Sequence, residues 1–295
     1  KYTLVVTPPS GSEGADLGLS VGTGLTDVAG NAIASSTNAT AQPWDTKAPS
    51  VTSVSDNVAD AVTRGTIDFT VTFHEAVVGT VGTGHFSASN GTVSSVTHTG
   101  VNISGQDVYV VSVTPTADVA TGSVALTLKG TDGSTQLKDA AGNNVAASTS
   151  LQSFDAQTID TGAPVVTLTS ETLTSFGDRA RVKSDEAGTL YLVDSTVNVT
   201  QLSDITSLSG SRAKSLNYVN AGVDATIDTT GLNVGTYKLY AVDSYGNLTL
   251  STSANKPSAN TVTVIDGYTL HGSASGVNVE GMNLISKTVT TVSGA

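Results

Sequence analysis

Short clusters of hydrophobic residues, each the length of a β-strand, recur along the chain and are separated by Gly, Asn, Asp and Pro. Turn residues at intervals of about 8–12 positions are typical of two antiparallel sheets packed face to face, with a jelly roll or a barrel as the alternative. No apolar run reaches the roughly 18 residues of a membrane-spanning helix. Between residues 45 and 159 the pattern predicts seven strands: Ser50–Ser55, Thr66–Phe73, His85–Ser89, Val93–Thr97, Val108–Thr114, Val124–Lys129 and Val145–Ser150.

Two short strings repeat in the same order and divide the chain into similar parts. Asp-Val-Ala-Gly-Asn at Asp27–Asn31 returns as Asp-Ala-Ala-Gly-Asn at Asp139–Asn143 and as Asp-Ser-Tyr-Gly-Asn at Asp243–Asn247. Asp-Thr-Lys-Ala-Pro at Asp45–Pro49 returns as Asp-Thr-Gly-Ala-Pro at Asp160–Pro164. These spacings indicate tandem domains of about 105–115 residues.

The proline of the second string marks where each domain starts, because proline cannot donate to a sheet ladder and belongs at a strand's first residue or edge. We therefore predict one domain over residues 45–159 and another over 160–265. Residues 1–44 align with the second half of the 45–159 domain and are expected to be the C-terminal half of a similar domain. Residues 266–295 continue in strand-like alternation, as a tail or the start of a further domain.

Composition and charge narrow the class of protein. Charged residues make up only 13% of the chain, and the good helix formers are scarce, which favours an all-β protein. The net charge of −12 repels nucleic-acid phosphates and anionic lipids and attracts cations, so we expect no nucleic-acid partner and no direct membrane insertion. The absence of cysteine excludes disulfides and thiolate metal sites.

Asp-x-x-Gly-Asn followed by Asp-Thr-x-Ala-Pro resembles the bacterial immunoglobulin-like (Ig-like) repeats of giant repeat adhesins and some surface-layer proteins. The resemblance extends from about residue 20 to 266. It implies tandem Ig-like β-sandwiches in an elongated array on the bacterial cell surface, outside the cell. It also implies structural calcium at the domain junctions.

The topology of such a sandwich gives a separate reason to expect a cation. The start of the first strand, the second-to-third loop and the sixth-to-seventh loop lie at one end. In the 45–159 domain these positions hold Asp45, Glu75 and Asp139. Converging carboxylates repel one another unless a cation lies between them, and calcium accepts six to eight or so oxygen ligands in flexible geometry.

The next junction repeats the pattern. By the same reasoning Asp160, Glu186 and Asp243 should meet there, with Asp185 beside Glu186. Asn143 and Asn247 could add oxygen ligands to the two sites. The alternative is that Asp-x-x-Gly-Asn is only a turn, because Asp accepts local backbone hydrogen bonds and Gly takes positive φ. Turn chemistry alone does not explain Glu75 and Glu186.

Other chemistry finds little support in the sequence, and we expect no enzyme activity, no catalytic residues and no cofactor-binding residues. Ser211-Arg-Ala-Lys214 and Ser55-Asp-Asn57 have the form of β-lactamase motifs, but their order is reversed and Lys-Thr-Gly is lacking. The four histidines do not have metalloprotease spacing and are interpreted as sheet-surface or loop residues. Trp44 is expected to pack at a domain junction.

These observations favour a structural rod or stalk segment of a cell-surface adhesin, stiffened by junction calcium. One alternative is a surface-layer, sheath or filament subunit in which the tail of one copy completes the half-domain of the next. A second alternative, of another class, is a carbohydrate-binding or spacer module of a secreted hydrolase. The partners expected are neighbouring domains, identical subunits, and a cell-surface or glycan ligand.

Overall fold

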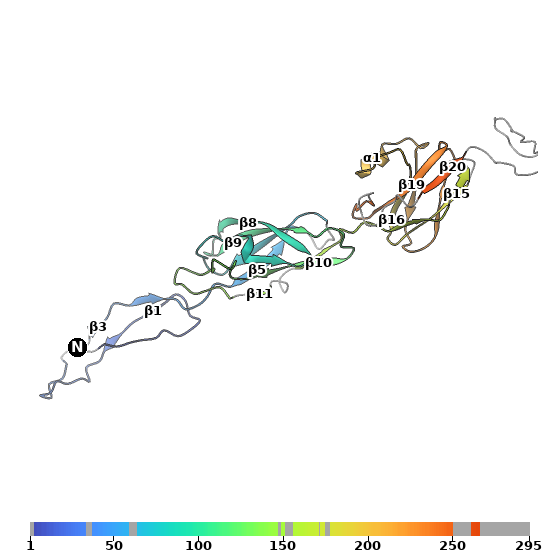
Figure 1. The fold of residues 1–295 in the computed structure, drawn as a ribbon. Helices are drawn as coiled ribbons and strands as arrows, with labels where there is room; N and C mark the ends of the chain where they lie inside the picture. The colour runs from blue at the N-terminus through green and yellow to red at the C-terminus, as the bar shows by residue number, and fades with distance from the viewer. Residues whose placement is uncertain are drawn as a thin grey trace, which may run out of the picture. The chain divides into compact units, whose positions relative to one another are not determined.

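The computed structural model describes residues 3–33, 37–58, 64–146, 149–150, 156–170, 172–174, 178–249 and 261–265. The chain divides into two compact units, residues 1–162 and 163–295. Regular structure is almost entirely strand (Figure 1), which confirms the all-β class. Helix in the described residues is limited to α1 (Leu202–Thr206) and the 3₁₀ turn η1 (Thr83–His85), and neither has the length needed to cross a membrane. The predicted tail at 266–295 lies outside the described residues.

One sheet of the first unit contains four strands in the order β5-β6-β9-β8, all antiparallel. Their bounds are β5 (Val51–Asp56), β6 (Ile67–Phe73), β8 (Gly91–Val101) and β9 (Asp107–Pro115). Strand β6 shows why they form a sheet that covers a core: every second residue from Ile67 to Phe73 is fully buried, and the residues between are half-buried. This period of two places one apolar face toward the opposite sheet.

The second sheet is built around β10, which pairs with β7 and with successive short strands β11 and β12. Their bounds are β7 (Phe86–Ala88), β10 (Gly122–Leu128), β11 (Thr149–Ser150) and β12 (Ala156–Ile159). In chain order the two sheets have the pairing of a constant-type Ig sandwich. The core lies between them, where Phe73 packs edge-to-face on Tyr109 with ring centroids 5.9 Å apart.

The last predicted strand of this domain, Val145–Ser150, is wrong in its bounds. Val145 is buried but lies in a loop, where its N–H donates to the Leu137 carbonyl at 2.8 Å. The sheet is closed instead by β12, eleven residues further along the chain than Val145 at its start. A buried loop valine and a strand valine give the same apolar signal, so the pattern could not separate them.

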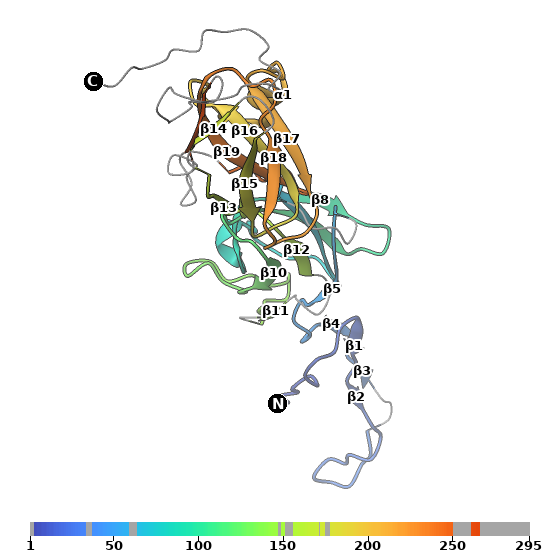
Figure 2. The same ribbon diagram turned by 90° about the vertical axis from the view of Figure 1, so that its right-hand side faces the viewer.

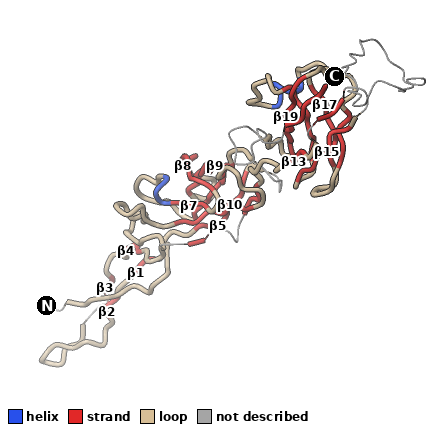
Figure 3. Tube along the Cα trace, turned by 45° about the vertical axis from the view of Figure 1, so that its right-hand side comes forward, coloured by secondary structure: helices blue, strands red, loops and turns tan. Residues whose placement is uncertain are grey.

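Residues 3–33 and 37–44 form two short antiparallel strand pairs and loops (Figure 3). The pairs are β1 (Ala15–Leu17) with β4 (Gln42–Trp44) and β2 (Ser20–Val21) with β3 (Thr37–Asn38). The β1–β4 pair resembles the β10–β12 pair. A hydrogen bond beside each pair is also repeated: next to β1–β4, Thr46 Oγ1 donates to the Pro9 carbonyl at 2.6 Å. Thr161 Oγ1 makes the same bond to the Thr116 carbonyl at 2.6 Å.

The second unit is also a two-sheet sandwich (Figure 2). One sheet has the order β13-β15-β18, with bounds Val166–Leu168, Arg179–Ser184 and Ala225–Asp228. The other has the order β14-β20-β19-β16-β17, with bounds Thr172–Thr174, Thr261–Ile265, Gly235–Asp243, Gly188–Asp194 and Ala213–Tyr218. Strand β14 runs parallel to β20, whereas the other pairs are antiparallel.

Two features distinguish this unit from the first. The single hydroxyl proton of the buried Tyr237 is shared between the carbonyls of Asn233 at 2.9 Å and Ser211 at 3.1 Å, the arrangement known as a tyrosine corner. The connection from β16 to β17 carries α1, and its Ile205 packs with Val193 and Tyr240 in a second apolar cluster. This connection therefore covers Val193 of β16 and Tyr240 of β19 on a sheet face that would otherwise be exposed.

Candidate metal centre

Asp45, Glu75 and Asp139 come together in the first unit, although they lie far apart in the sequence. One carboxylate oxygen from each lies within 4.8 Å of the others. Asp45 precedes β5, Glu75 follows β6, and Asp139 lies in the loop after β10, so the sandwich topology places all three at the same end. We call these three residues the carboxylate cluster.

Asp139 is the most buried and the most firmly positioned member, with 2% of its surface exposed. Its Oδ1 accepts the Asn143 backbone N–H at 2.8 Å, and its Oδ2 accepts the Asn143 side-chain N–H at 2.7 Å. Burial raises the pKa of Asp139, but these hydrogen bonds outweigh it, so the pKa lies below its usual value. Asp139 is thus held as a charged carboxylate that faces Asp45 and Glu75.

Asn143 makes two hydrogen bonds with its side-chain nitrogen. Its side-chain nitrogen faces Asp139 and also donates to the Asp45 carbonyl at 3.2 Å. Asn143 therefore ties the loop to the linker at Asp45, and it is the amide nitrogen that points to both partners. Its service as an oxygen ligand stays a prediction.

Glu75 is the exceptional member of the cluster. Its side chain is 18% exposed, and its buried Oε1 accepts no hydrogen bond from any described residue. Oε1 lies 3.0 Å from His74 Nε2, but that N–H is directed to Glu13 Oε2 at 2.9 Å. Burial raises the pKa of Glu75; His74 opposes this, while the charges of Asp45 and Asp139 add to it.

The chemistry of this group fits a hard cation. Its donors are carboxylate oxygens, the ligands that calcium prefers, and they come from three separate segments. An orphaned buried oxygen among like charges costs free energy that a bound cation would recover. The cluster itself contains no nitrogen or sulfur ligand that would favour zinc or copper.

The second predicted set is distributed over the two units. In the first unit, Asp160 Oδ1 accepts the Gly162 N–H at 3.1 Å. In the second unit, Asp243 and Asn247 are buried and repeat the bonds of the Asp139 loop at 2.8 and 2.7 Å. A joint site for this set stays a prediction.

The remaining two residues of that set follow β15. Asp185 Oδ1 accepts the Val165 N–H at 2.7 Å, so this carboxylate holds the start of β13 in place. The backbone N–H of Glu186 donates a hydrogen bond to Ser184 Oγ at 3.3 Å. Asp185 therefore has a structural task that is independent of any cation.

The Asp-x-x-Gly-Asn string forms the same turn wherever it occurs. In the exposed first copy, Asp27 accepts the Asn31 backbone N–H at 2.8 Å and the Asn31 side-chain N–H at 2.9 Å. Gly30 and Gly142 both have positive φ, +89° and +95°. The turn interpretation is therefore sufficient for the string itself, and only its neighbours make the second copy a candidate site.

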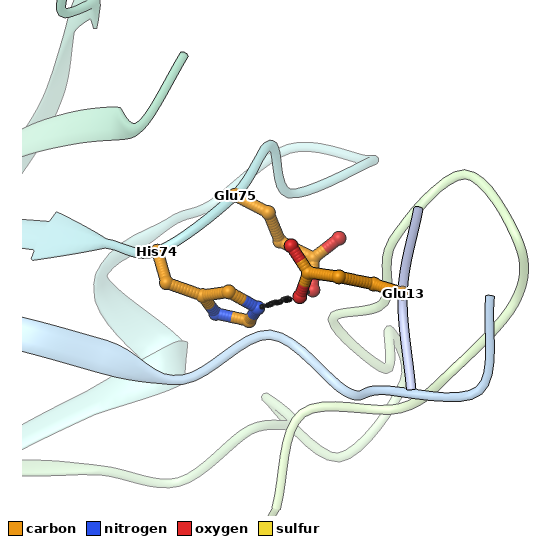
Figure 4. Close-up of side chains that lie close together, drawn as sticks. All are labelled: Glu13, His74 and Glu75. Atoms are coloured by element: carbon orange, nitrogen blue, oxygen red, sulfur yellow. Dashed lines mark hydrogen bonds and ion pairs between the residues drawn. The ribbon is translucent and has the colours of Figure 1, made fainter. Parts of the chain in front are cut away.

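Glu13 and His74 lie beside the cluster and were not among the predicted site residues. Figure 4 shows the two carboxyl groups of Glu13 and Glu75 close to the His74 ring, and one ligand atom from each of the three residues lies within 4.8 Å of the others. Glu13 could have been found by aligning 1–44 on the 45–159 domain, because the alignment places it just before the strand that pairs with β4, next to the junction with the 45–159 domain.

Residues 45–155 match the family model described as a bacterial Ig-like domain. The match confirms, for this segment, the resemblance inferred from the repeated strings. No curated protein matches the chain.

Three solved structures give an idea of the wider similarity. The N-terminal eight Ig domains of Down Syndrome Cell Adhesion Molecule match 75% of this chain and 25% of theirs, at 10% identity and a TM-score of 0.25. SGBP-B of a Bacteroides ovatus mixed-linkage glucan utilization locus, in complex with a heptasaccharide, matches 87% of this chain over 64% of its own length. The sequence identity is 12% and the TM-score is 0.22. A tandem pair of titin Ig domains matches 75% of this chain over 98% of its own length, with a sequence identity of 7% and a TM-score of 0.19. TM-scores this low support no conclusion about function.

Proposed function

We propose that this chain is a structural segment of a bacterial cell-surface repeat protein, located outside the cell, in which calcium at the carboxylate cluster stiffens the junction before the 45–159 domain. The observation that carries the proposal is the buried Glu75 Oε1, which accepts no hydrogen bond from the described residues while facing two further carboxylates. No catalytic role is proposed.

The role of the ion would be mechanical. Asp45 belongs to residues 45–50, the linker that leads from residues 1–44 into β5, whereas Glu75 and Asp139 belong to loops of the sandwich itself. A calcium ion, when bound, supplies a multivalent bridge between oxygen ligands on separate segments. These residues would then fix the linker, and in a chain of domains that contact mainly their neighbours, stiffness depends on the linkers.

The sequence repeat extends the proposal to the second predicted set: Asp160, Asp185, Glu186, Asp243 and Asn247. Repetition at every junction suits an adhesin stalk. The same construction would serve a surface-layer protein, and the adhesin stalk is the version we favour.

The test is calcium titration of the full chain, monitored by the fluorescence of Trp44 and by the temperature of thermal unfolding. Trp44 is the single tryptophan and immediately precedes Asp45, so its emission reports on this junction. Calcium at a hundred times its Kd should stabilise the first unit by about 2.7 kcal/mol. Magnesium, which demands a smaller octahedral site, should be much less effective.

Glu75→Gln keeps the size of the side chain and removes the charge. The variant should lose the Trp44 response and the calcium-dependent rise in Tm. A wild-type chain whose Trp44 emission and Tm ignore calcium would contradict the proposal. A calcium effect that persists in Glu75→Gln would place the ion elsewhere.

A second candidate function is self-assembly by strand addition, favoured by the apolar side chains that residues 3–33 expose: Leu4, Val5, Val6, Leu19, Val21, Leu25, Val28 and Ile33. Strands from residues 266–295 of another copy would cover this surface in a head-to-tail polymer. Sedimentation of the full chain over a wide concentration range, with a 266–295 peptide as competitor, tests it. A monomer at every concentration contradicts it.

A further inference from the structure

Glu13 connects residues 1–44 to the 45–159 domain. Its Oε2 accepts a hydrogen bond from His74 Nε2 at 2.9 Å and lies 2.8 Å from Lys47 Nζ. Lys47 belongs to the linker, and His74 follows β6 directly. We call Glu13, Lys47 and His74 the latch, because they join three segments at one oxygen atom.

His74 is held in one tautomer. Its Nδ1 accepts the Ser50 N–H at 3.0 Å, so Nδ1 carries no proton and Nε2 is the N–H donor. The second unit supports this assignment. There Asp185 takes the position of His74, and its carboxylate, which can only accept, receives the Val165 N–H at 2.7 Å.

The tautomer determines what the latch can bind. A transition metal between Glu13, His74 and Glu75 would need the lone pair of Nε2 and would move the proton to Nδ1. That proton would then face the Ser50 N–H at hydrogen-bond distance. His74 is therefore a fixed donor to a carboxylate and is unsuited to be a metal ligand.

Two carboxylates compete for this single donor. Glu13 Oε2 lies 2.9 Å from His74 Nε2 and Glu75 Oε1 lies 3.0 Å from it, but one N–H can be directed at only one of them. Glu13 and Glu75 therefore repel each other across the ring, and anything that neutralises Glu75 strengthens the hold on Glu13.

The latch residues are particular to this junction. The matching hydrogen bonds Thr46–Pro9 and Thr161–Thr116 set the correspondence, and the second copies of the three positions are Ala120, Gly162 and Asp185. None of these three side chains could reproduce the latch, since two carry no polar side-chain atom and the third is an acceptor.

We propose that the latch couples the attachment of residues 9–13 to the cation at the carboxylate cluster, with Glu13 as the positioning residue that senses the charge of Glu75. The coupling rests on the proposed calcium site. By linkage, calcium tightens the hold on Glu13, and a held Glu13 raises the affinity for calcium by the same factor.

The experiment compares full-length wild type, Glu13→Gln and the control Asp16→Asn. Asp16 is an exposed carboxylate three residues away, so the control removes the same charge from the same segment. Calcium affinity is measured by Trp44 fluorescence. Amide hydrogen exchange is measured at Gly11 and Thr46, whose N–H groups join the segment to the linker, without calcium and at saturating calcium.

We expect calcium to slow exchange at these amides about fivefold or more in wild type and in Asp16→Asn. In Glu13→Gln the affinity should fall by a similar factor, and saturating calcium should no longer slow exchange. At saturating calcium the site is filled in every variant, so a weaker affinity caused only by the lost charge no longer affects the exchange rates. Lys47→Met leaves Glu13, His74 and Glu75 in place, so saturating calcium should still slow exchange in this variant.

Two results would overturn the proposal and are distinguishable. If wild type binds calcium and Glu13→Gln behaves like Asp16→Asn, the latch is only structural and the calcium site stands. If wild type shows no calcium response by fluorescence, the proposed function fails, and the coupling fails with it.

Discussion

The loops Asp27–Asn31 and Asp139–Asn143 have the same sequence pattern and the same hydrogen bonds, but their surroundings differ. Asp27 is exposed, whereas Asp139 is 2% exposed and faces Asp45 and Glu75. The string therefore encodes a turn, and the candidate site is created by what the sandwich places beside that turn. The same substitution made in each loop separates the contribution of the turn from that of its surroundings.

The largest difference is expected for Asp139→Asn against Asp27→Asn. The new amide at 139 would turn an N–H toward the Asn143 donor, which should cost about 1–3 kcal/mol. It should also weaken calcium binding at least about tenfold. Asp27→Asn should leave calcium affinity unchanged. Thermal unfolding and Trp44 titration check both variants, and equal effects would show that the carboxylate cluster has no special role.

A smaller effect of opposite sign is expected for Glu75→Gln in calcium-free protein. Removing one of three like charges that lie within 4.8 Å of one another should stabilise the first unit by roughly 1 kcal/mol at neutral pH. The folded-state pKa of Glu75 is raised above 4.5, chiefly by burial, so the folded state favours the protonated form. The contribution of the protonated Glu75 side chain to stability is then fully present below pH 4.5 and is lost as pH rises through the folded-state pKa.

Denaturant unfolding at several pH values measures this pH dependence of the free energy of unfolding in wild type and Glu75→Gln. The two proteins should have similar stability at low pH, and Glu75→Gln should become the more stable one as pH rises. Calcium should reverse that order at pH 7. A Glu75→Gln variant that is less stable than wild type in EDTA at pH 7 would refute the repulsion argument.

The smallest effect, and one on which the loops should agree, is expected for Gly30→Ala and Gly142→Ala. Both glycines have positive φ, and an added Cβ at Gly30 would meet no atom within 4 Å. The cost is then conformational, about 1 kcal/mol in each loop. Hydrogen exchange of the Asn31 and Asn143 amides measures it locally. Gly142 is exposed and an added Cβ there also meets no atom within 4 Å, so a markedly larger loss at Gly142 would contradict a purely conformational cost.

The sequence predicted the sandwich and the meeting of Asp45, Glu75 and Asp139, because strand periodicity and repeated strings depend on local spacing and on chain order. It did not predict the latch, because Glu13 meets His74 across 61 residues through the register of β1 with β4. The closing strand was misplaced for a related reason. Four residues at β12 carry little periodic signal, and burial of Val145 in a loop imitates a strand.

The parallel pair β14–β20 of the second unit has a consequence for a chain under tension. Thr172, Leu173 and Thr174 pair in register with Thr263, Val264 and Ile265 near the two ends of the described domain. A force that pulls the domain by those ends moves the two strands past each other along their axes. All their hydrogen bonds are then loaded together rather than broken one after another, so this short pair is expected to be the clamp that sets the rupture force of the domain.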